Sequence, residues 1–137
     1  GMNLGGRYVF PFGSVKFVPA LHSSGYEIDG VMTYMGEASG IILEAEDKKI
    51  YHAGDTALFS DMRLFAKDKS IDVAFLPIGD NYTMGPEDAL EAVSYLNPEI
   101  TIPIHYNTFP VIQQNPAIFV EQVVGGKVLN PGETILV

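Results

Sequence analysis

The 137-residue sequence contains no cysteine and no tryptophan, and it has few basic residues. Without cysteine, neither a disulfide nor a thiolate metal site can form, so any metal ion must be held by histidine, aspartate or glutamate. Eight lysines and arginines against 17 acidic residues give a net charge of -9. This charge repels phosphate backbones and anionic lipid, so we expect no nucleic-acid partner bound by a basic patch.

Long hydrophobic runs are also absent. No segment approaches the ~18 consecutive apolar residues of a membrane span, and the N-terminus lacks the basic and then apolar pattern of a signal peptide. We therefore expect no membrane partner, and a cytoplasmic location follows as the default. Gly1 precedes Met2, which is typical of the scar that tag cleavage leaves, so we exclude Gly1 from the fold.

An apolar content of 47% indicates a folded chain, and 137 residues suit a single domain. Alternating apolar residues and turn signals predict two β-hairpins, 7–10 with 14–19 and 39–45 with 49–53, and segment 20–30 is expected to be a loop. In the first hairpin, Val15 and Phe17 are expected to face inward, and Ser14 and Lys16 outward. Helix and strand patterns alternate after residue 56, with helices expected at 57–66, 86–96 and 116–124 and strands at 71–78, 99–104, 127–129 and 134–137. The fold class is α/β (α+β), a mixed sheet with helices on one face.

Asp55 follows a predicted strand directly, at the Gly54 turn before the expected helix 57–66. A carboxylate at the C-terminal end of a strand is a typical functional position in open α/β sheets. An aspartate in this position is also a common helix cap, because its side chain accepts hydrogen bonds from free backbone N–H groups. Taken alone, the residue fits either role.

His22 and His105 lie in comparable positions, each where a predicted strand passes into a loop. One sheet edge could therefore present both imidazoles together with the carboxylate of Asp55, and these are ligand types that zinc accepts. A single histidine at a strand end also fits a purely structural role. His52 lies inside a strand and points to the face opposite Tyr51, so we interpret it as a structural or supporting residue.

Five blocks of the sequence resemble, in the same order, blocks of the uncharacterised metal-dependent hydrolase branch of the metallo-β-lactamase superfamily. They are PALHSS at 19–24, YHAGDT at 51–56, LPIG at 76–79, YTMGPEDA at 82–89 and PIHYNTFP at 103–110. The resemblance implies an αββα sandwich, with a site for one or two divalent metal ions at one edge. Zinc is the expected metal, and manganese or iron would also suit such a site. In such sites a metal-bound hydroxide attacks an ester, amide or phosphodiester bond.

By motif, the resemblance assigns His22 to the first metal ion, Asp55 to a position bridging both ions, and His105 to the second ion. Asp55 is therefore the expected catalytic residue as well as a ligand. His52, Thr56, Tyr106 and Asn107 are expected to support the site or to face the substrate. A role for Asn107 in the loop turn is at least as well supported, and the sequence does not specify the small-molecule substrate.

The superfamily's His-x-His-x-Asp-His run is missing, and three histidines could not supply it. We therefore expect residues 1–137 to form a single partial domain, the C-terminal half of the sandwich. Such a chain should bind metal weakly or not at all and should be inactive alone, because a catalytic zinc usually keeps three protein ligands.

Two interpretations of function remain open at this point. The first is a part of a metal-dependent hydrolase, and the second is a non-catalytic half-domain that serves as a binding or self-assembly module. A half-sandwich would leave one sheet face uncovered, with apolar strands at 41–43 and 73–76. Since exposed apolar faces normally mark interfaces, we expect a homodimer through this face.

Overall fold

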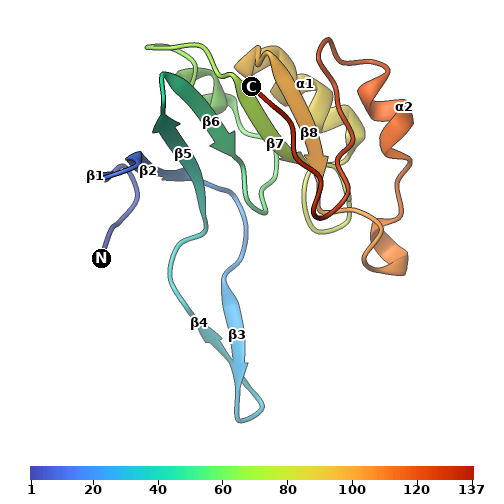
Figure 1. Cartoon of the computed structure of the whole chain (residues 1–137). Helices are drawn as coiled ribbons and strands as arrows, with labels where there is room; N and C mark the ends of the chain where they lie inside the picture. The colour runs from blue at the N-terminus through green and yellow to red at the C-terminus, as the bar shows by residue number, and fades with distance from the viewer.

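The computed structural model describes residues 1–137. Six strands form one mixed sheet in the order β1-β2-β5-β6-β7-β8, and β3 and β4 form a separate two-stranded sheet (Figure 1). The strands are β1 (Arg7–Phe10), β2 (Gly13–Pro19), β3 (Gly25–Ile28), β4 (Val31–Tyr34), β5 (Ser39–Ala45), β6 (Lys48–His52), β7 (Val73–Pro77) and β8 (Ile100–Ile104). The helices are the 3-10 helices η1 (Ser60–Leu64) and η2 (Pro110–Ile112) and the α-helices α1 (Pro86–Leu96) and α2 (Pro116–Val120).

The sheet changes from antiparallel to parallel along its width. β1, β2, β5 and β6 pair antiparallel, whereas β7 and β8 pair parallel to β6. A two-residue turn joins β5 to β6, and both of its residues, Glu46 and Asp47, have positive φ angles, as the hairpin turns that match strand twist require. Because β6, β7 and β8 run in the same direction, their C-terminal ends meet at one edge of the sheet.

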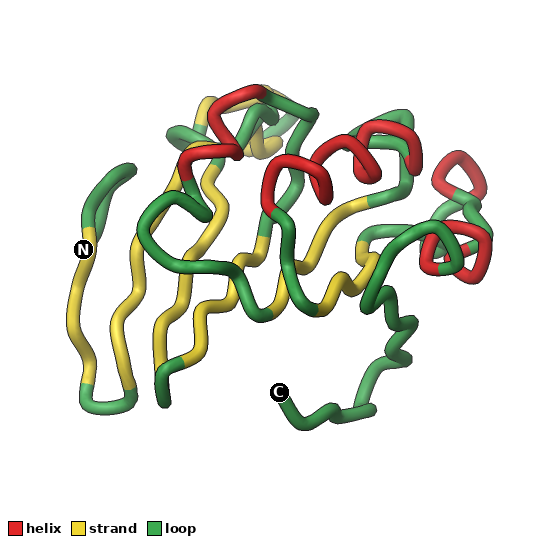
Figure 2. Tube along the Cα trace, turned by 90° about the horizontal axis from the view of Figure 1, so that it is seen from above, coloured by secondary structure: helices red, strands yellow, loops and turns green.

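The helices lie on one face of this sheet (Figure 2). Strand side chains on that face, including Tyr51, Ala74 and Leu76, pack with Met62 of η1 and Leu96 of α1 into the main core. This arrangement confirms the predicted mixed sheet with helices on one face. The predicted bounds of α1 are confirmed as well, with proline in its first turn and a left-handed residue, Asn97, at its C-terminal cap.

The opposite face of the sheet carries Ile50, Phe75 and Ile102, which line a hollow together with C-terminal residues between Leu129 and Val137. We expected strand 73–76 to be exposed on an uncovered face, and this is wrong. Val73, Ala74 and Leu76 are buried, because the C-terminal segment covers one side of β7 and the helices cover the other. Ile41, nearer the other edge of the sheet, remains 39% exposed.

Several predicted elements differ from the structure. The helix expected at 57–66 is only the short η1, and the helix expected at 116–124 ends at Val120. Val15 and Phe17 are no more buried than Ser14 and Lys16, and Val18 is the buried residue of β2. This follows because β1 and β5 flank β2, while the helices reach only the end of β2 that holds Val18.

The strands expected at 127–129 and 134–137 are not formed. One isolated bridge, between Thr101 and Gly126, is the only ladder contact near them. Strand-forming residues need a neighbouring backbone to pair with, and the end of the chain crosses the sheet face without one. Leu136 in this unpaired end of the chain is exposed.

The segment expected to be a loop, 20–30, contains β3, which pairs with β4 as an arm that projects from the body (Figure 1). Asp29 and Gly30 form the connecting turn, and both have positive φ angles. None of the helices is long and apolar enough to span a membrane.

Candidate functional site

The candidate site lies at the sheet edge where β6, β7 and β8 end. Gly54 turns the chain after β6 with a φ of 66°, and the next residue is Asp55. His105 follows β8 directly and turns the chain with a φ of 54°. Since the two strands flank β7 and run parallel to it, their last residues come together across the end of β7.

Asp55 and His105 are in contact. The Oδ2 atom of Asp55 lies 3.5 Å from Nε2 of His105, and the two side chains are 48% and 22% exposed. The interaction is an ion pair only when the imidazole is protonated. Asp55 does not cap a helix, because η1 begins five residues later, behind Phe59, with no side-chain cap. The structure therefore removes the capping interpretation of Asp55.

His105 is held by the backbone at the end of β7. A Cβ atom built on Gly79 would lie 2.3 Å from the carbonyl oxygen of His105 and 3.2 Å from its Nδ1. Only a glycine leaves room for this approach. The Nδ1 atom is buried and has no hydrogen-bond partner. The sequence did not predict this contact of Gly79 with His105, although Gly79 is the last residue of the LPIG block.

Thr56 ties the Asp55 turn to the loop that carries His22. Its buried Oγ1 accepts a hydrogen bond from the backbone N–H of Leu21 at 2.9 Å and donates to the carbonyl of Ala57 at 2.8 Å. The Thr56 carbonyl also accepts from the N–H of Met84. Thr56 thus faces the interior of the loop junction, and its hydroxyl supports the site rather than facing solvent.

His22 itself stands apart from the pair. Its ring is exposed, and its Nδ1 lies 2.6 Å from the carbonyl oxygen of Ser23. No group of three His, Asp or Glu side chains in the structure is arranged to hold a metal ion. Of the three residues expected at one sheet edge, the structure brings Asp55 and His105 together and leaves His22 outside the pair.

His52 supports the turn that presents Asp55. Its Nδ1 accepts a hydrogen bond from the N–H of Gly54 at 3.1 Å, and its ring stacks on Phe75. Burial lowers the pKa of His52, and the nearby carboxylate of Asp55 opposes this shift only in part. His52 and the buried Tyr51 point to opposite faces of the sheet, as predicted.

Tyr106 and Asn107 both make contacts with other residues of the chain. Tyr106 packs against the small core cluster that contains Phe119, and burial raises the pKa of its hydroxyl. Asn107 has a positive φ, and its Oδ1 accepts a hydrogen bond from the N–H of Gln114 at 2.8 Å. These contacts give Asn107 the loop-turn role that the sequence left open.

The Asp55–His105 pair consists of donor types that suit a divalent metal ion. A histidine nitrogen and a carboxylate oxygen are both ligands of zinc, and the ends of β6 and β8 bring them together across the end of β7. The pair fits two positions of a coordination shell and leaves the others to further donors.

Comparison with known proteins identifies the family of the chain. The family model described as "Beta-lactamase superfamily domain" matches residues 1–106, and the chain belongs to this superfamily. It is 98% identical, over all 137 residues, to a UPF0173 metal-dependent hydrolase from Enterococcus faecalis, of which it covers 61%. It is 55% identical over 98% of its length to a UPF0173 metal-dependent hydrolase from Bacillus thuringiensis, again covering 61%.

Solved structures show the same fold. Igni18, a metallo hydrolase from the archaeon Ignicoccus hospitalis, superimposes with a TM-score of 0.85 at 38% identity, over 98% of this chain and 59% of that one. Zn(2+)-bound PqqB from Methylobacterium extorquens superimposes with a TM-score of 0.65 at 16% identity, over 99% of this chain and 55% of that one. The chain thus spans about 60% of the length of the relatives it matches.

Proposed function

We propose that this chain contributes part of the active site of a metal-dependent hydrolase, in which Asp55 and His105 are ligands of a divalent metal ion. The observation that carries the proposal is the 3.5 Å contact between Asp55 Oδ2 and His105 Nε2 at adjoining strand ends. Membership of the superfamily and the names of the relatives support it. No observation favours the alternative of a non-catalytic binding module.

A divalent metal ion bound at this edge would supply Lewis acidity that activates water and polarises the scissile bond of an ester, amide or phosphodiester. The residues of this chain prepare that chemistry. Asp55 places an anionic oxygen beside Nε2 of His105, so the two atoms could serve as neighbouring ligands. His52 and Thr56 fix the turn on either side of Asp55.

We include His22 as a further ligand in the complete site. The Leu21–Thr56 hydrogen bond holds the His22 loop next to the Asp55 turn. The His22 ring is exposed, so it can rotate from the Ser23 carbonyl toward the pair at little cost in packing. Zinc is the metal we propose, since nitrogen and carboxylate ligands in combination suit it, and manganese and iron are the alternatives.

The test uses the Enterococcus faecalis relative. Its positions aligned with Asp55 and His105 are each replaced by alanine, and metal per chain is measured by plasma mass spectrometry beside hydrolysis of p-nitrophenyl acetate and bis(p-nitrophenyl) phosphate. Both variants should lose metal and activity together, whereas alanine at the position aligned with the exposed Asp61 should change neither. Full metal content in both variants would refute the assignment of ligands.

A further inference from the structure

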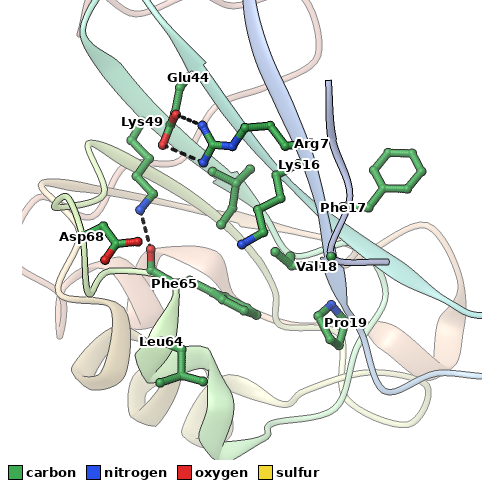
Figure 3. Close-up of a pocket in the computed structure, with 12 residues that line it drawn as sticks. Arg7, Lys16, Phe17, Val18, Pro19, Glu44, Lys49, Leu64, Phe65 and Asp68 are labelled. Atoms are coloured by element: carbon green, nitrogen blue, oxygen red, sulfur yellow. Dashed lines mark hydrogen bonds and ion pairs between the residues drawn. The ribbon is translucent and has the colours of Figure 1, made fainter. Parts of the chain in front are cut away.

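A cavity lies on the helix side of the sheet, away from the Asp55–His105 pair. Its volume is about 230 Å³, and it opens between β1, β2, β5 and β6 on one side and residues 64–68 on the other (Figure 3). None of its lining residues belongs to the candidate metal site. This volume is below the ~300–1,000 Å³ of pockets for drug-sized ligands, so any ligand must be small.

Positive charge gathers at this cavity. Three of the chain's eight basic residues line it, Arg7, Lys16 and Lys49, together with two acids, Glu44 and Asp68. The lining therefore carries one positive charge in excess, although the whole chain has a net charge of -9. In a protein of such acidity, this cavity is a place where an anion meets a favourable local charge.

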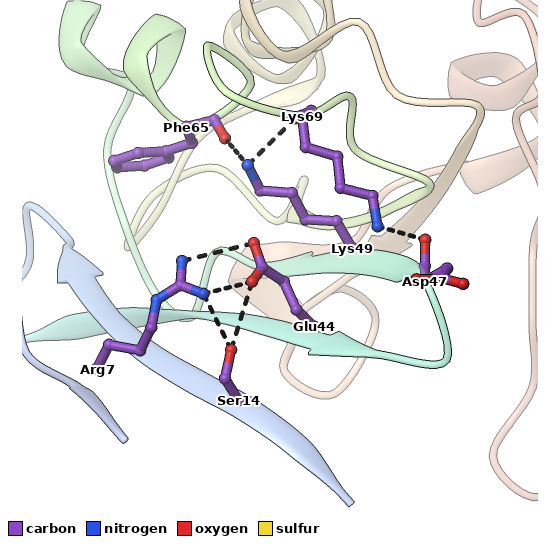
Figure 4. A network of polar contacts seen from close by, with 7 residues as sticks. All are labelled: Arg7, Ser14, Glu44, Asp47, Lys49, Phe65 and Lys69. Carbon is purple, nitrogen blue, oxygen red and sulfur yellow. Dashed lines mark hydrogen bonds and ion pairs between the residues drawn. The ribbon is translucent and has the colours of Figure 1, made fainter. Parts of the chain in front are cut away.

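Lys49 is the least expected of these residues, because its side chain is buried. The residue is 4% exposed, and its ammonium group donates to the backbone carbonyls of Phe65 at 2.5 Å and Lys69 at 3.1 Å (Figure 4). No carboxylate lies within 4.0 Å of it. Burial lowers the pKa of Lys49, and the negative charges of Glu44 and Asp68 oppose this shift only in part.

Arg7 and Lys16 differ in how free their charges are. The guanidinium of Arg7 pairs with Glu44, which also contacts Ser14 (Figure 4). Lys16 has no ion-pair partner, and its ammonium group is turned into the cavity (Figure 3). The positive charges available to a ligand are therefore those of Lys16 and Lys49.

The rest of the wall is apolar. Val18, Pro19, Leu64 and Phe65 line the cavity next to the two lysines, and Figure 3 shows the Phe65 ring extending along its floor toward Pro19. A ligand that satisfies both parts of this surface has an anionic head and a short apolar body.

We propose that this cavity binds a small monocarboxylate, with the carboxylate between the ammonium groups of Lys16 and Lys49 and the apolar body against Leu64 and Phe65. A single negative charge matches the single excess positive charge of the lining. A dianion such as phosphate is disfavoured, because its second charge would face Glu44 and Asp68.

The probe is benzoate, titrated into the ¹⁵N-labelled chain and followed by amide chemical shifts. Saturable shifts should be confined to the segments that line the cavity, residues 5–7, 16–19, 42–49 and 64–69. Lys16→Met should weaken binding about tenfold, as expected for the loss of one charge-assisted hydrogen bond. Lys67→Met is the matched control, because Lys67 is exposed on the same segment but does not line the cavity, and it should leave the affinity unchanged.

Two ligand controls complete the test. Benzyl alcohol keeps the ring without the charge, and inorganic phosphate carries more charge without the ring, so both should bind at least about tenfold more weakly than benzoate. Equal binding of benzyl alcohol and benzoate, tighter binding of phosphate, equal losses in Lys16→Met and Lys67→Met, or the absence of saturable shifts in β2 would each overturn the proposal.

Discussion

The closest backbone approach at the candidate site gives a sharp prediction for Gly79→Ala. The added Cβ would lie 2.3 Å from the carbonyl oxygen of His105, 3.1 Å from Cβ of Ile112 and 3.2 Å from Nδ1 of His105. Cβ atoms essentially never come within 3.0 Å of such an atom, so the chain at position 79 and the His105 turn must separate by at least 0.7 Å. The atom to be displaced is backbone, which no change of rotamer can move.

The cost follows from this displacement. Overpacking that forces backbone shifts costs about 1–3 kcal/mol, and in a chain of this size that lowers the melting temperature by roughly 4–12 °C. The Ile78 N–H donates to the Ile104 carbonyl at 3.1 Å just before the contact, so the separation also strains the last rung between β7 and β8. His105 should move relative to Asp55, and metal affinity should fall with stability.

Gly85→Ala is the matched control. Gly85 lies in the same connection between β7 and α1, and a Cβ there would come only to 3.3 Å from Asp80, whose side chain can rotate. Thermal unfolding followed by circular dichroism measures both variants. If Gly79→Ala melts within about 1 °C of the parent chain, a change too small for backbone overpacking, our account of how β7 holds His105 is wrong.

Three further outcomes are expected. Tyr51→Phe should have a free energy of unfolding in urea equal to that of the parent chain or up to about 1 kcal/mol higher, because the buried Tyr51 hydroxyl has no hydrogen-bond partner. A loss above about 1 kcal/mol would show that this hydroxyl does make a hydrogen bond. Burial alone would raise the pKa of Asp72, but the Lys49 N–H and the Lys48 ammonium outweigh it and hold the pKa below that of an ordinary aspartate. The Asp72 carboxylate therefore stabilises the fold at pH values above the ordinary aspartate pKa, and this contribution is lost as pH falls through the lowered pKa. The free energy of unfolding, measured from pH 6 down to pH 2, should fall less steeply in Asp72→Asn than in the parent chain. An unchanged slope would contradict this. We propose that the sheet face around Ile41 mediates a homodimer, which Ile41→Asp should disrupt, and light scattering that shows a monodisperse monomer of the parent chain at high concentration would exclude it.

Local signals predicted α1 and the two hairpins of the main sheet well. In α1, the Pro86 start, the acids in its first turn and the Asn97 stop agree with the apolar spacing, so every signal favours one helix. The β3–β4 arm was missed although Asp29-Gly30 is a strong hairpin turn. β4 exposes apolar residues on both faces, and the alternation in β3 extends over only four residues, so neither strand gave a clear pattern.

The remaining differences depend on long-range partners. The residues 134–137 have strand-forming side chains, but pairing needs a neighbouring backbone that local sequence does not specify. The same limit applies to the site. The strand-end positions of Asp55 and His105 were visible from pattern and motif, whereas the approach of Gly79 to His105 depends on how three strands meet. The position of His22 relative to the pair also depends on a contact between distant loops, through Thr56.

The most direct test of the central claim is a zinc titration of this chain, followed by ¹⁵N shifts of the three histidine rings. We predict weak binding, because the Asp55–His105 pair supplies fewer than the three protein ligands of a usual catalytic zinc. The response should appear at Nε2 of His105 and vanish in Asp55→Ala, while the His52 ring stays unchanged. Tight stoichiometric binding that survives Asp55→Ala, or a response at His52 without one at His105, would show that the metal site is elsewhere.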